Sequence, residues 1–309
     1  MNKYLLIVII FILIKSLYDT IYNSKYINTQ LKENFQNKHK IAFCFLTIGD
    51  IKQKNIWINF FNGNMDRCNI YVHPKIKEEV SPFFKRFIIN KLIPTSWGHV
   101  SLVDATNLMI KNALKDTNNK KIILVSDSCI PIKNFDYIYN EVLSDDKSWF
   151  NYYRPNNLQG SKEHLRRIKL LDQSLKKNAH INEQWMVLDR KHAELLNSNI
   201  GLMKYFRIPR LIPDEIYYIT VLHHINKNIK NELKYGIRNR QNYLRHEYVT
   251  FAKWFDEQTK KWQIKHPIEF NRMRVQDVNK MKYSKALFAR KFSKSSNIEK
   301  YWNYIVSNK

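Results

Sequence analysis

The sequence contains very little glycine and very little cysteine. Only 6 of its 309 residues are glycine, and neither the G-x-G-x-x-G pattern nor a P-loop occurs, which argues against a nucleotide site built on a glycine loop. The 3 cysteines form no C-x-x-C pair and no cluster with histidine, which argues against structural zinc. Cys44 lies in an apolar run and is expected to be buried, while a disulfide between Cys68 and Cys129 stays open.

Acidic residues are also scarce. The chain has 27 Asp and Glu against 52 Lys and Arg, a formal net charge of +25. Such an excess favours an anionic partner, which could be nucleic acid, a membrane surface or a phosphorylated substrate. The basic residues are spread along the whole chain, however, and no zinc-finger, RRM or KH pattern occurs, so no nucleic-acid partner is predicted. The chain is rich in Lys, Asn and Ile throughout, and this general composition explains most of the charge.

One long apolar run stands at the N-terminus. It extends without a break from Tyr4 to Ile14, between Lys3 and Lys15. The run is shorter than the about 20 residues of a membrane-spanning helix, and its length fits the core of a signal peptide.

No small-residue cleavage site follows the run, so we predict an uncleaved signal-anchor over residues 1–20, extended by Leu17 and Tyr18. A buried helix of the folded domain is the alternative. Residues 21–39 are polar and lysine-rich and are expected to form a stem, and residues 40–309 are expected to form the folded domain.

Beyond the stem, apolar strands alternate with amphipathic helices. Strands are predicted in KIAFCFLTIGD, CNIYVHPK and KKIILVSDSCIPI, and helices in SLVDATNLMIKNALKD and NFDYIYNEVL. Further on, EQWMVLDRKHAELL is predicted to be a strand that continues into a helix, residues 155–182 a loop, and PDEIYYITVLHHI a helix. This alternation predicts an α/β fold with a Rossmann-like, mostly parallel central sheet.

Asp127 stands where the third of these strands ends. In open α/β sheets, ligands bind at the carboxyl ends of the strands. An Asp-x-Asp metal pair would need a second acid two residues later, but Cys129 occupies that position. The second acid of such a pair is therefore missing, and if the protein binds a diphosphate without a metal, other groups must neutralise its charge.

The order of several sequence blocks carries a family resemblance. These blocks are KIAFCFLTIGDI, DRCNIYVHPK, IPTSWGHVSLVDATNLMIKNAL, ILVSDSCIPIKNFDYIY, NEQWMVLDRKHAELL, LIPDEIYYITVL, YVTFAKW with HPIEF, and LFARKF. With them the chain resembles the core-2/I-branching β-1,6-N-acetylglucosaminyltransferase family, glycosyltransferase family 14, and is most similar to its plant-type branch. The resemblance covers roughly residues 40–295.

The resemblance implies a GT-A-like fold for residues 40–309, which would be the catalytic domain. It also implies inverting transfer of a sugar from a UDP-sugar to a hydroxyl of a glycan or glycoprotein acceptor, with no metal or other cofactor. N-acetylglucosamine is the expected sugar and xylose the second choice. With the signal-anchor, it implies a single-pass type II membrane protein whose catalytic domain lies in a Golgi-like lumen. The alternatives are a non-catalytic protein that binds UDP or sugar, and a basic protein of membrane surfaces.

Glu215 matches the position of the family's catalytic glutamate. A carboxylate within hydrogen-bond reach of the acceptor hydroxyl is a suitable general base. In the alternative interpretation, Asp214 and Glu215 merely follow Pro213 at a helix start, where acidic residues are favourable.

Two cations are implied for the leaving diphosphate. The lysine of LFARKF is Lys291, with Arg290 as its neighbour. The family's arginine is harder to place, because HPIEFNRMR departs from the His-x-Arg spacing. Arg272 or Arg274 is the expected substitute, and we take Arg272 first.

The resemblance also places His73, Asp127 and Trp97 at the donor nucleotide. His73 could instead be a structural hydrogen bonder after its strand, and Trp97 could belong to the core. Trp185 is expected in the core or on the acceptor side of the site.

Overall fold

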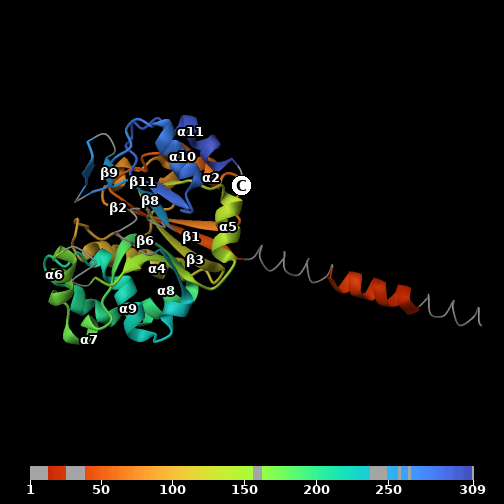
Figure 1. Cartoon of the computed structure of the whole chain (residues 1–309), viewed down its shortest axis with the longest axis horizontal. Helices are drawn as coiled ribbons and strands as arrows, with labels where there is room; N and C mark the ends of the chain where they lie inside the picture. The colour runs from red at the N-terminus through yellow and green to blue at the C-terminus, as the bar shows by residue number, and fades with distance from the viewer. Residues whose placement is uncertain are drawn as a thin grey trace, which may run out of the picture.

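The computed structural model of the chain describes residues 13–25, 39–155, 162–236, 249–256, 259–263 and 266–307. Figure 1 shows an α/β body and, apart from it, a helix over residues 13–25. Among the described helices, none combines the length and the apolar character that crossing a membrane requires. Most of the predicted signal-anchor and stem lies outside the described residues, so both remain predictions.

A sheet of six strands forms the centre of the body, in the order β2-β1-β3-β6-β5-β7. β1 pairs in parallel with β2 and β3, and β5 pairs in parallel with β7, whereas β6 runs antiparallel between β3 and β5. The strands are β1 (Lys40–Thr47), β2 (Cys68–Pro74), β3 (Asn119–Ser126), β5 (Ser148–Tyr153), β6 (Ile181–Asp189) and β7 (Leu233–Gly236). The predicted α/β class with a mostly parallel sheet is confirmed.

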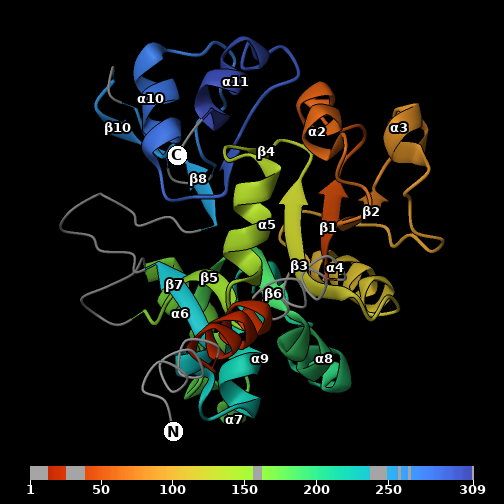
Figure 2. The same cartoon turned by 90° about the vertical axis from the view of Figure 1, so that its right-hand side faces the viewer.

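A second sheet pairs β4 (Ile130–Pro131), β11 (Phe288–Arg290) and β8 (Thr250–Ala252), and a short ribbon pairs β9 (Phe255–Asp256) with β10 (Lys261–Trp262). The helices are α2 (Lys54–Phe61), α3 (Pro82–Lys85), α4 (Ser101–Ala113), α5 (Phe135–Leu143), α6 (Lys162–Leu170), α7 (Gln173–Lys176), α8 (Arg190–Ser198), α9 (Tyr217–Ile225), α10 (Val275–Tyr283) and α11 (Glu299–Val306). Short 3-10 helices are η1 (Lys77–Glu79), η2 (Ile200–Phe206), η3 (Pro213–Glu215) and η4 (Ile229–Glu232). Figures 1 and 2 place α8 and α9 on one side of the central sheet and α10, α11 and β8 on the other.

The core begins with the apolar run of β1. Every residue of this strand after Lys40 is buried, as expected for a strand covered on both faces. Phe43 and Phe45 pack edge-on against Trp57 of α2, with ring centroids 6.1 and 4.8 Å apart. Each such buried aromatic side chain contributes about 1.5–3 kcal/mol of transfer free energy, so α2 is fixed firmly beside the carboxyl end of β1.

Three local predictions were wrong. The third strand ends at Ser126, because the backbone turns there and resumes only as β4. The stretch predicted as a loop, 155–182, contains α6 and α7. The predicted helix 213–225 begins as the 3-10 turn η3, since Ile216, with φ −134° and ψ −36°, interrupts helical geometry before α9.

The cysteines behave as small apolar side chains. Cys44, Cys68 and Cys129 are all free and buried, so the Cys68–Cys129 disulfide does not form. Burial raises the pKa of the Cys129 thiol, which disfavours the reactive thiolate.

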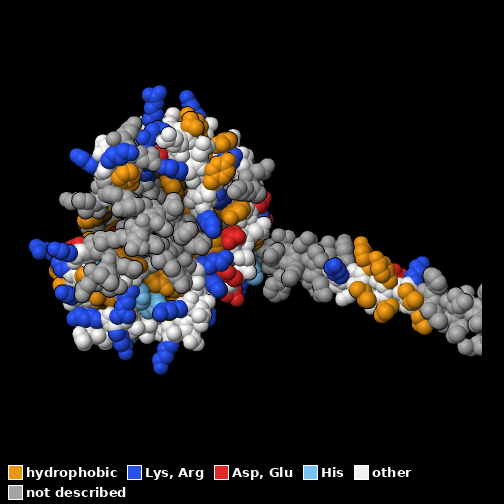
Figure 3. All heavy atoms as spheres, viewed as in Figure 1, with side chains coloured by type: hydrophobic (Ala, Val, Ile, Leu, Met, Phe, Trp, Pro, Cys, Tyr) orange, Lys and Arg blue, Asp and Glu red, His pale blue; other side chains and the backbone are white. Residues whose placement is uncertain are grey.

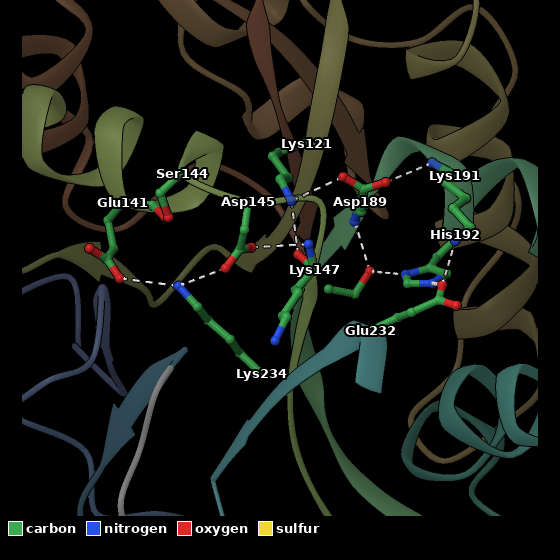
Figure 4. A network of polar contacts seen from close by, with 11 residues as sticks. Lys121, Glu141, Ser144, Asp145, Lys147, Asp189, Lys191, His192, Glu232 and Lys234 are labelled. Atoms are coloured by element: carbon green, nitrogen blue, oxygen red, sulfur yellow. Dashed lines mark hydrogen bonds and ion pairs between the residues drawn. The ribbon is translucent and has the colours of Figure 1, made fainter. Parts of the chain in front are cut away.

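A polar network closes the amino-terminal end of β3 (Figure 4). The Lys121 ammonium lies 3.0 Å from the Asp189 carboxylate, and these side chains are only 1% and 8% exposed. Lys121 also donates to the carbonyl oxygen of Lys147 at 2.8 Å. Because Asp127 follows the other end of β3, this network and the Asp127 turn lie at opposite edges of the sheet.

Candidate active site

The turn that carries Asp127 is held rigidly by its backbone. The carbonyl oxygens of residues 127, 128 and 129 accept hydrogen bonds from the backbone of Lys52, the backbone of Phe292 and the indole of Trp57, at 2.9, 3.0 and 2.8 Å. Three separate parts of the chain therefore fix this turn. The half-buried Asp127 side chain has no hydrogen-bond or ion-pair partner among the described residues, so its carboxylate is available to a ligand.

Lys291 and Arg290 lie beside this turn. β11 runs antiparallel to β4, with Ala289 opposite Ile130, and this pairing carries the following residues past Ser128. Both basic side chains are half-buried. The structure thus brings the backbone on both sides of Arg290 and Lys291 against the turn that carries Asp127, although the two segments lie far apart in the sequence.

Arg290 has a specific support. Its guanidinium lies over the ring of Trp185 in β6, 4.7 Å from the ring centroid, a cation–π contact. Its Nε is buried and has no hydrogen-bond partner among the described residues. Because buried donors are normally paired, this nitrogen is well suited to an anionic ligand.

Arg272 and Arg274 differ in their surroundings. Arg272 is exposed and has no hydrogen-bond or ion-pair partner in the described part of the chain. Arg274 precedes α10, and its Nε donates to Asp277 at 2.9 Å, a carboxylate that also pairs with Lys253 at 2.6 Å. The nearby backbone of Phe270 donates to the Lys291 carbonyl at 2.7 Å, which keeps this segment beside β11. The role assigned to Arg272 stays a prediction.

His73 is fully buried at the end of β2. Its Nε2 accepts a hydrogen bond from the backbone N–H of Ile93 at 2.9 Å, and burial lowers its pKa. The ring is therefore neutral, with its proton on Nδ1, which has no partner among the described residues. In this position His73 fixes the start of the loop that leads to Trp97, as the structural alternative expected; contact with a nucleotide stays a prediction.

Trp97 lies at the surface and not in the core. Its side chain is 71% exposed, and its ring meets that of His266 edge-on at 5.6 Å. The next residue, Gly98, has φ +67°, and a Cβ built there would lie 3.6 Å from Ile212 Cγ1. The Trp97 loop therefore packs between the segment around His266 and the turn before Glu215.

The turn before Glu215 has unusual backbone geometry. Arg210 and Ile212 both adopt positive φ, 64° and 55°. This region is unfavourable for residues other than glycine, most of all for a β-branched one, and costs on the order of 1–3 kcal/mol for each residue. Such strain is maintained only where the surrounding structure holds it, and it is concentrated at functional sites.

Glu215 is half-exposed at the end of this turn. Its side chain is 38% exposed, and its Oε2 lies 2.5 Å from Nη1 of Arg167, whose side chain is only 8% exposed. Arg167 belongs to α6, inside the stretch that was predicted to be a loop. Arg167 was not among the residues predicted for the site, although the basic helical pattern of SKEHLRRIKLL was a signal that could have shown the helix.

Asp214 is the second carboxyl group of the turn, but it is buried. Burial, followed by the charge of Glu215, raises its pKa to about 7, and its Oδ1 has no partner among the described residues. Asp214 is therefore partly protonated at neutral pH. Of the two acids, Glu215 is the one that an acceptor can reach.

Ser148, His192 and Glu232 superficially resemble a hydrolase triad. Ser148 Oγ lies 2.7 Å from His192 Nδ1, and His192 Nε2 lies 3.0 Å from Glu232 Oε2. Ser148 is completely buried, and its Oγ also accepts the backbone N–H of Asp189 at 2.8 Å. No substrate can reach this hydroxyl, so the array is structural.

Among the described residues, no three His, Cys, Asp or Glu side chains converge as a metal site would require. Independence from metal in the reaction stays a prediction.

Comparison with known proteins identifies the family. The family model described as "Core-2/I-Branching enzyme" matches residues 41–282, most of the chain. The chain belongs to the Core-2/I-branching enzyme family. The family predicted from the sequence blocks is confirmed.

Three further likenesses accompany this match. "Glycosyltransferase BC10" of Oryza sativa subsp. japonica is 29% identical over 175 residues, which cover 54% of this chain and 43% of that protein. The chain thus matches less than half the length of this relative. Among solved structures, the galactosyltransferase LgtC, in complex with donor and acceptor sugar analogues, has a TM-score of 0.34 and 9% identity over 68% of this chain and 75% of its own. The A197 protein from STIV has a TM-score of 0.24 and 10% identity over 50% and 67%.

Proposed function

We propose that this member of the Core-2/I-branching family is an inverting glycosyltransferase. It moves a sugar, N-acetylglucosamine first and xylose second, from a UDP-sugar to a hydroxyl of a glycan acceptor, without a metal or other cofactor. The observation that carries the proposal is the position of Glu215, a reachable carboxylate on a strained turn that is ion-paired with a buried arginine. The family match over residues 41–282 supports the same reaction class.

In the proposed reaction, Glu215 accepts the proton of the acceptor hydroxyl while that oxygen attacks the anomeric carbon of the donor. The bond between this carbon and the UDP oxygen breaks, and its electron pair leaves with UDP. Attack from the face opposite UDP inverts the anomeric configuration. Lys291, with Arg290 beside it, compensates the negative charge that develops on the leaving diphosphate.

The donor test is a panel of UDP-sugars offered to the full chain in detergent, with and without EDTA. We expect one UDP-sugar to be consumed, UDP to be released at the same rate in chelator, and the product to have the inverted anomeric configuration by NMR. Loss of activity in EDTA that manganese restores would contradict the metal-free mechanism. If no UDP-sugar is consumed, the alternative of a non-catalytic UDP- or sugar-binding protein gains support.

Lys291→Ala should weaken UDP binding about 10- to 100-fold, because a half-buried charged contact to phosphate is worth about 1.5–3 kcal/mol. Lys294→Ala is the matched control: its side chain is exposed three residues later, and its loss should change UDP affinity less than about 3-fold. Calorimetry that gives equal affinities for the two variants would remove Lys291 from the site.

The face of the molecule drawn in Figure 3 gives no sign of a basic stripe for nucleic acid. On the face drawn in Figure 3, Lys and Arg side chains are distributed around the folded body and do not gather in one stripe. Steep salt dependence of binding to nucleic acid would nevertheless favour that rival.

For localisation, we propose a single-pass type II membrane protein with its catalytic domain in a Golgi-like lumen. The Lys3-flanked apolar run without a cleavage site motivates this proposal. A mature N-terminus found beyond residue 20 by protein sequencing would replace the anchor with a secreted form.

A further inference from the structure

Two consecutive arginines of α6 hold the strained turn at both of its ends. Arg166 donates from Nη2 to the carbonyl oxygen of Arg210 at 3.1 Å, at the first positive-φ residue of the turn. Arg167 contacts the Glu215 carboxylate at the last residue of the turn. α6 thus contacts both ends of the turn that carries Glu215, the proposed base, and stabilises its position.

Arg167 is bound on two sides. Besides its contact with Glu215 Oε2, its Nε lies 3.4 Å from Oε1 of Glu163, one helical turn earlier in α6. Glu163 is shared, because Arg166 also binds it at 2.6 and 2.8 Å, but it stays beside the guanidinium of Arg167 when Glu215 takes up a proton and becomes neutral. Arg167 can therefore stay in place through a complete reaction cycle.

The contact with Arg167 also makes the two carboxylate oxygens of Glu215 different from each other. Oε2 faces Arg167, and Oε1 has no partner among the described residues. A half-exposed glutamate has several accessible rotamers, and a general base must lie within about 2.6–3.2 Å of the proton that it removes. Fixing Oε2 leaves Oε1 as the oxygen that meets the acceptor hydroxyl.

We infer that Arg167 is a positioning residue for the reaction: it acts through Glu215, holding the carboxylate in the orientation needed for proton removal. This inference rests on the proposed function. It places the acceptor hydroxyl on the Oε1 side of Glu215, away from α6. A planar guanidinium suits this role better than an ammonium group, which lacks its fixed donor geometry.

The test measures kcat for transfer and UDP affinity in the full chain, with Arg167→Met and Arg167→Lys. Misplacement of a catalytic group by about 1 Å can cost 10²-fold in rate, so Arg167→Met should lower kcat about 10- to 100-fold and leave UDP affinity unchanged. Arg167→Lys should recover part of the rate, and added guanidinium should do so for Arg167→Met. Arg190→Met is the matched control, because Arg190 pairs with Glu194 at 2.7 Å outside the proposed site. This variant should keep kcat within about 3-fold of the wild type, and added guanidinium should not raise its kcat.

A second comparison separates positioning from a structural role. In a Glu215→Gln background, Arg167→Met should lower the remaining rate less than about 2-fold, because residues that act as a unit are not additive. An undiminished loss in that background, a loss of UDP affinity, or wild-type kcat in Arg167→Met overturns the inference. If Arg167→Met does not fold, Arg167→Lys decides by the same criteria. Wild-type turnover in Glu215→Gln alone would show that the proposed base is wrong, and absence of transfer by the wild-type chain would overturn both proposals.

Discussion

Glu215→Gln should lower sugar transfer by about 10²–10⁴-fold while UDP binding stays close to that of the wild type. Glutamine keeps the size of the side chain and can still accept a hydrogen bond from Arg167, but it cannot take up the acceptor proton as a carboxylate does. General-base catalysis typically contributes a factor of this size. The measurement pairs the initial rate of transfer with UDP affinity from calorimetry.

Glu232→Gln is the control for this prediction. Glu232 also ends a 3-10 turn, η4, and is also ion-paired, with its Oε2 2.6 Å from the Lys191 ammonium. It belongs to the network at the opposite edge of the sheet. If Glu215 only stabilised its turn, both variants would lose a little stability and little rate. Near wild-type turnover in Glu215→Gln would rule out Glu215 as the base.

Asp189→Asn should lower the free energy of unfolding by about 3–5 kcal/mol, because it leaves the buried Lys121 ammonium without its counter-charge. Asparagine preserves the size of the side chain and its cap on α8, where Asp189 accepts the backbone N–H of Lys191 at 3.0 Å. The change therefore tests the charge alone. Urea unfolding at neutral pH measures it.

Two comparisons sharpen this result. Asp145→Asn breaks another Lys–Asp pair of Figure 4, between Asp145 and Lys234 at 3.2 Å. Both side chains of this pair are more than a quarter exposed, so the free energy of unfolding should fall by less than about 1 kcal/mol. Adding Lys121→Met to Asp189→Asn should recover most of the stability, because no buried charge remains. A loss in Asp189→Asn no larger than in Asp145→Asn would contradict the buried-pair account.

The predictions from sequence succeeded where the pattern is local and repeated. The apolar run of β1 and the amphipathic spacing of α4 and α5 each indicate, from their own residues, which side chains are buried. The α/β class followed from these local patterns. The predictions failed at turns. No periodic pattern marks the break after Ser126, because that turn is fixed by backbone hydrogen bonds from distant segments, and none marks the 3-10 turn before α9, where Ile216 interrupts helical geometry. The antiparallel direction of β6 was likewise not encoded in its own residues.

Among site residues, the sequence supplied identities but not surroundings. It pointed to Glu215 and Lys291 through blocks shared with the family, and their roles stay predictions. It could not show that Arg290 lies over Trp185, since those residues are brought together only by the position of β11 relative to β6. Nor could it distinguish an exposed Trp97 from a buried one, because a tryptophan fits either environment.

By itself, then, the amino-acid sequence determined the fold class, the family and the chemical types of the candidate residues, because each of these depends on local patterns or on the order of short blocks. Only the tertiary structure decided that Arg167 of α6 contacts Glu215, that the Asp127 turn is fixed by Lys52, Trp57 and Phe292, and that Ser148 is buried beyond reach of a substrate. These features depend on pairs of residues far apart in the chain. Such contacts form only when folding has ordered both segments, at a cost in conformational entropy, so the sequence of a single segment does not reveal them.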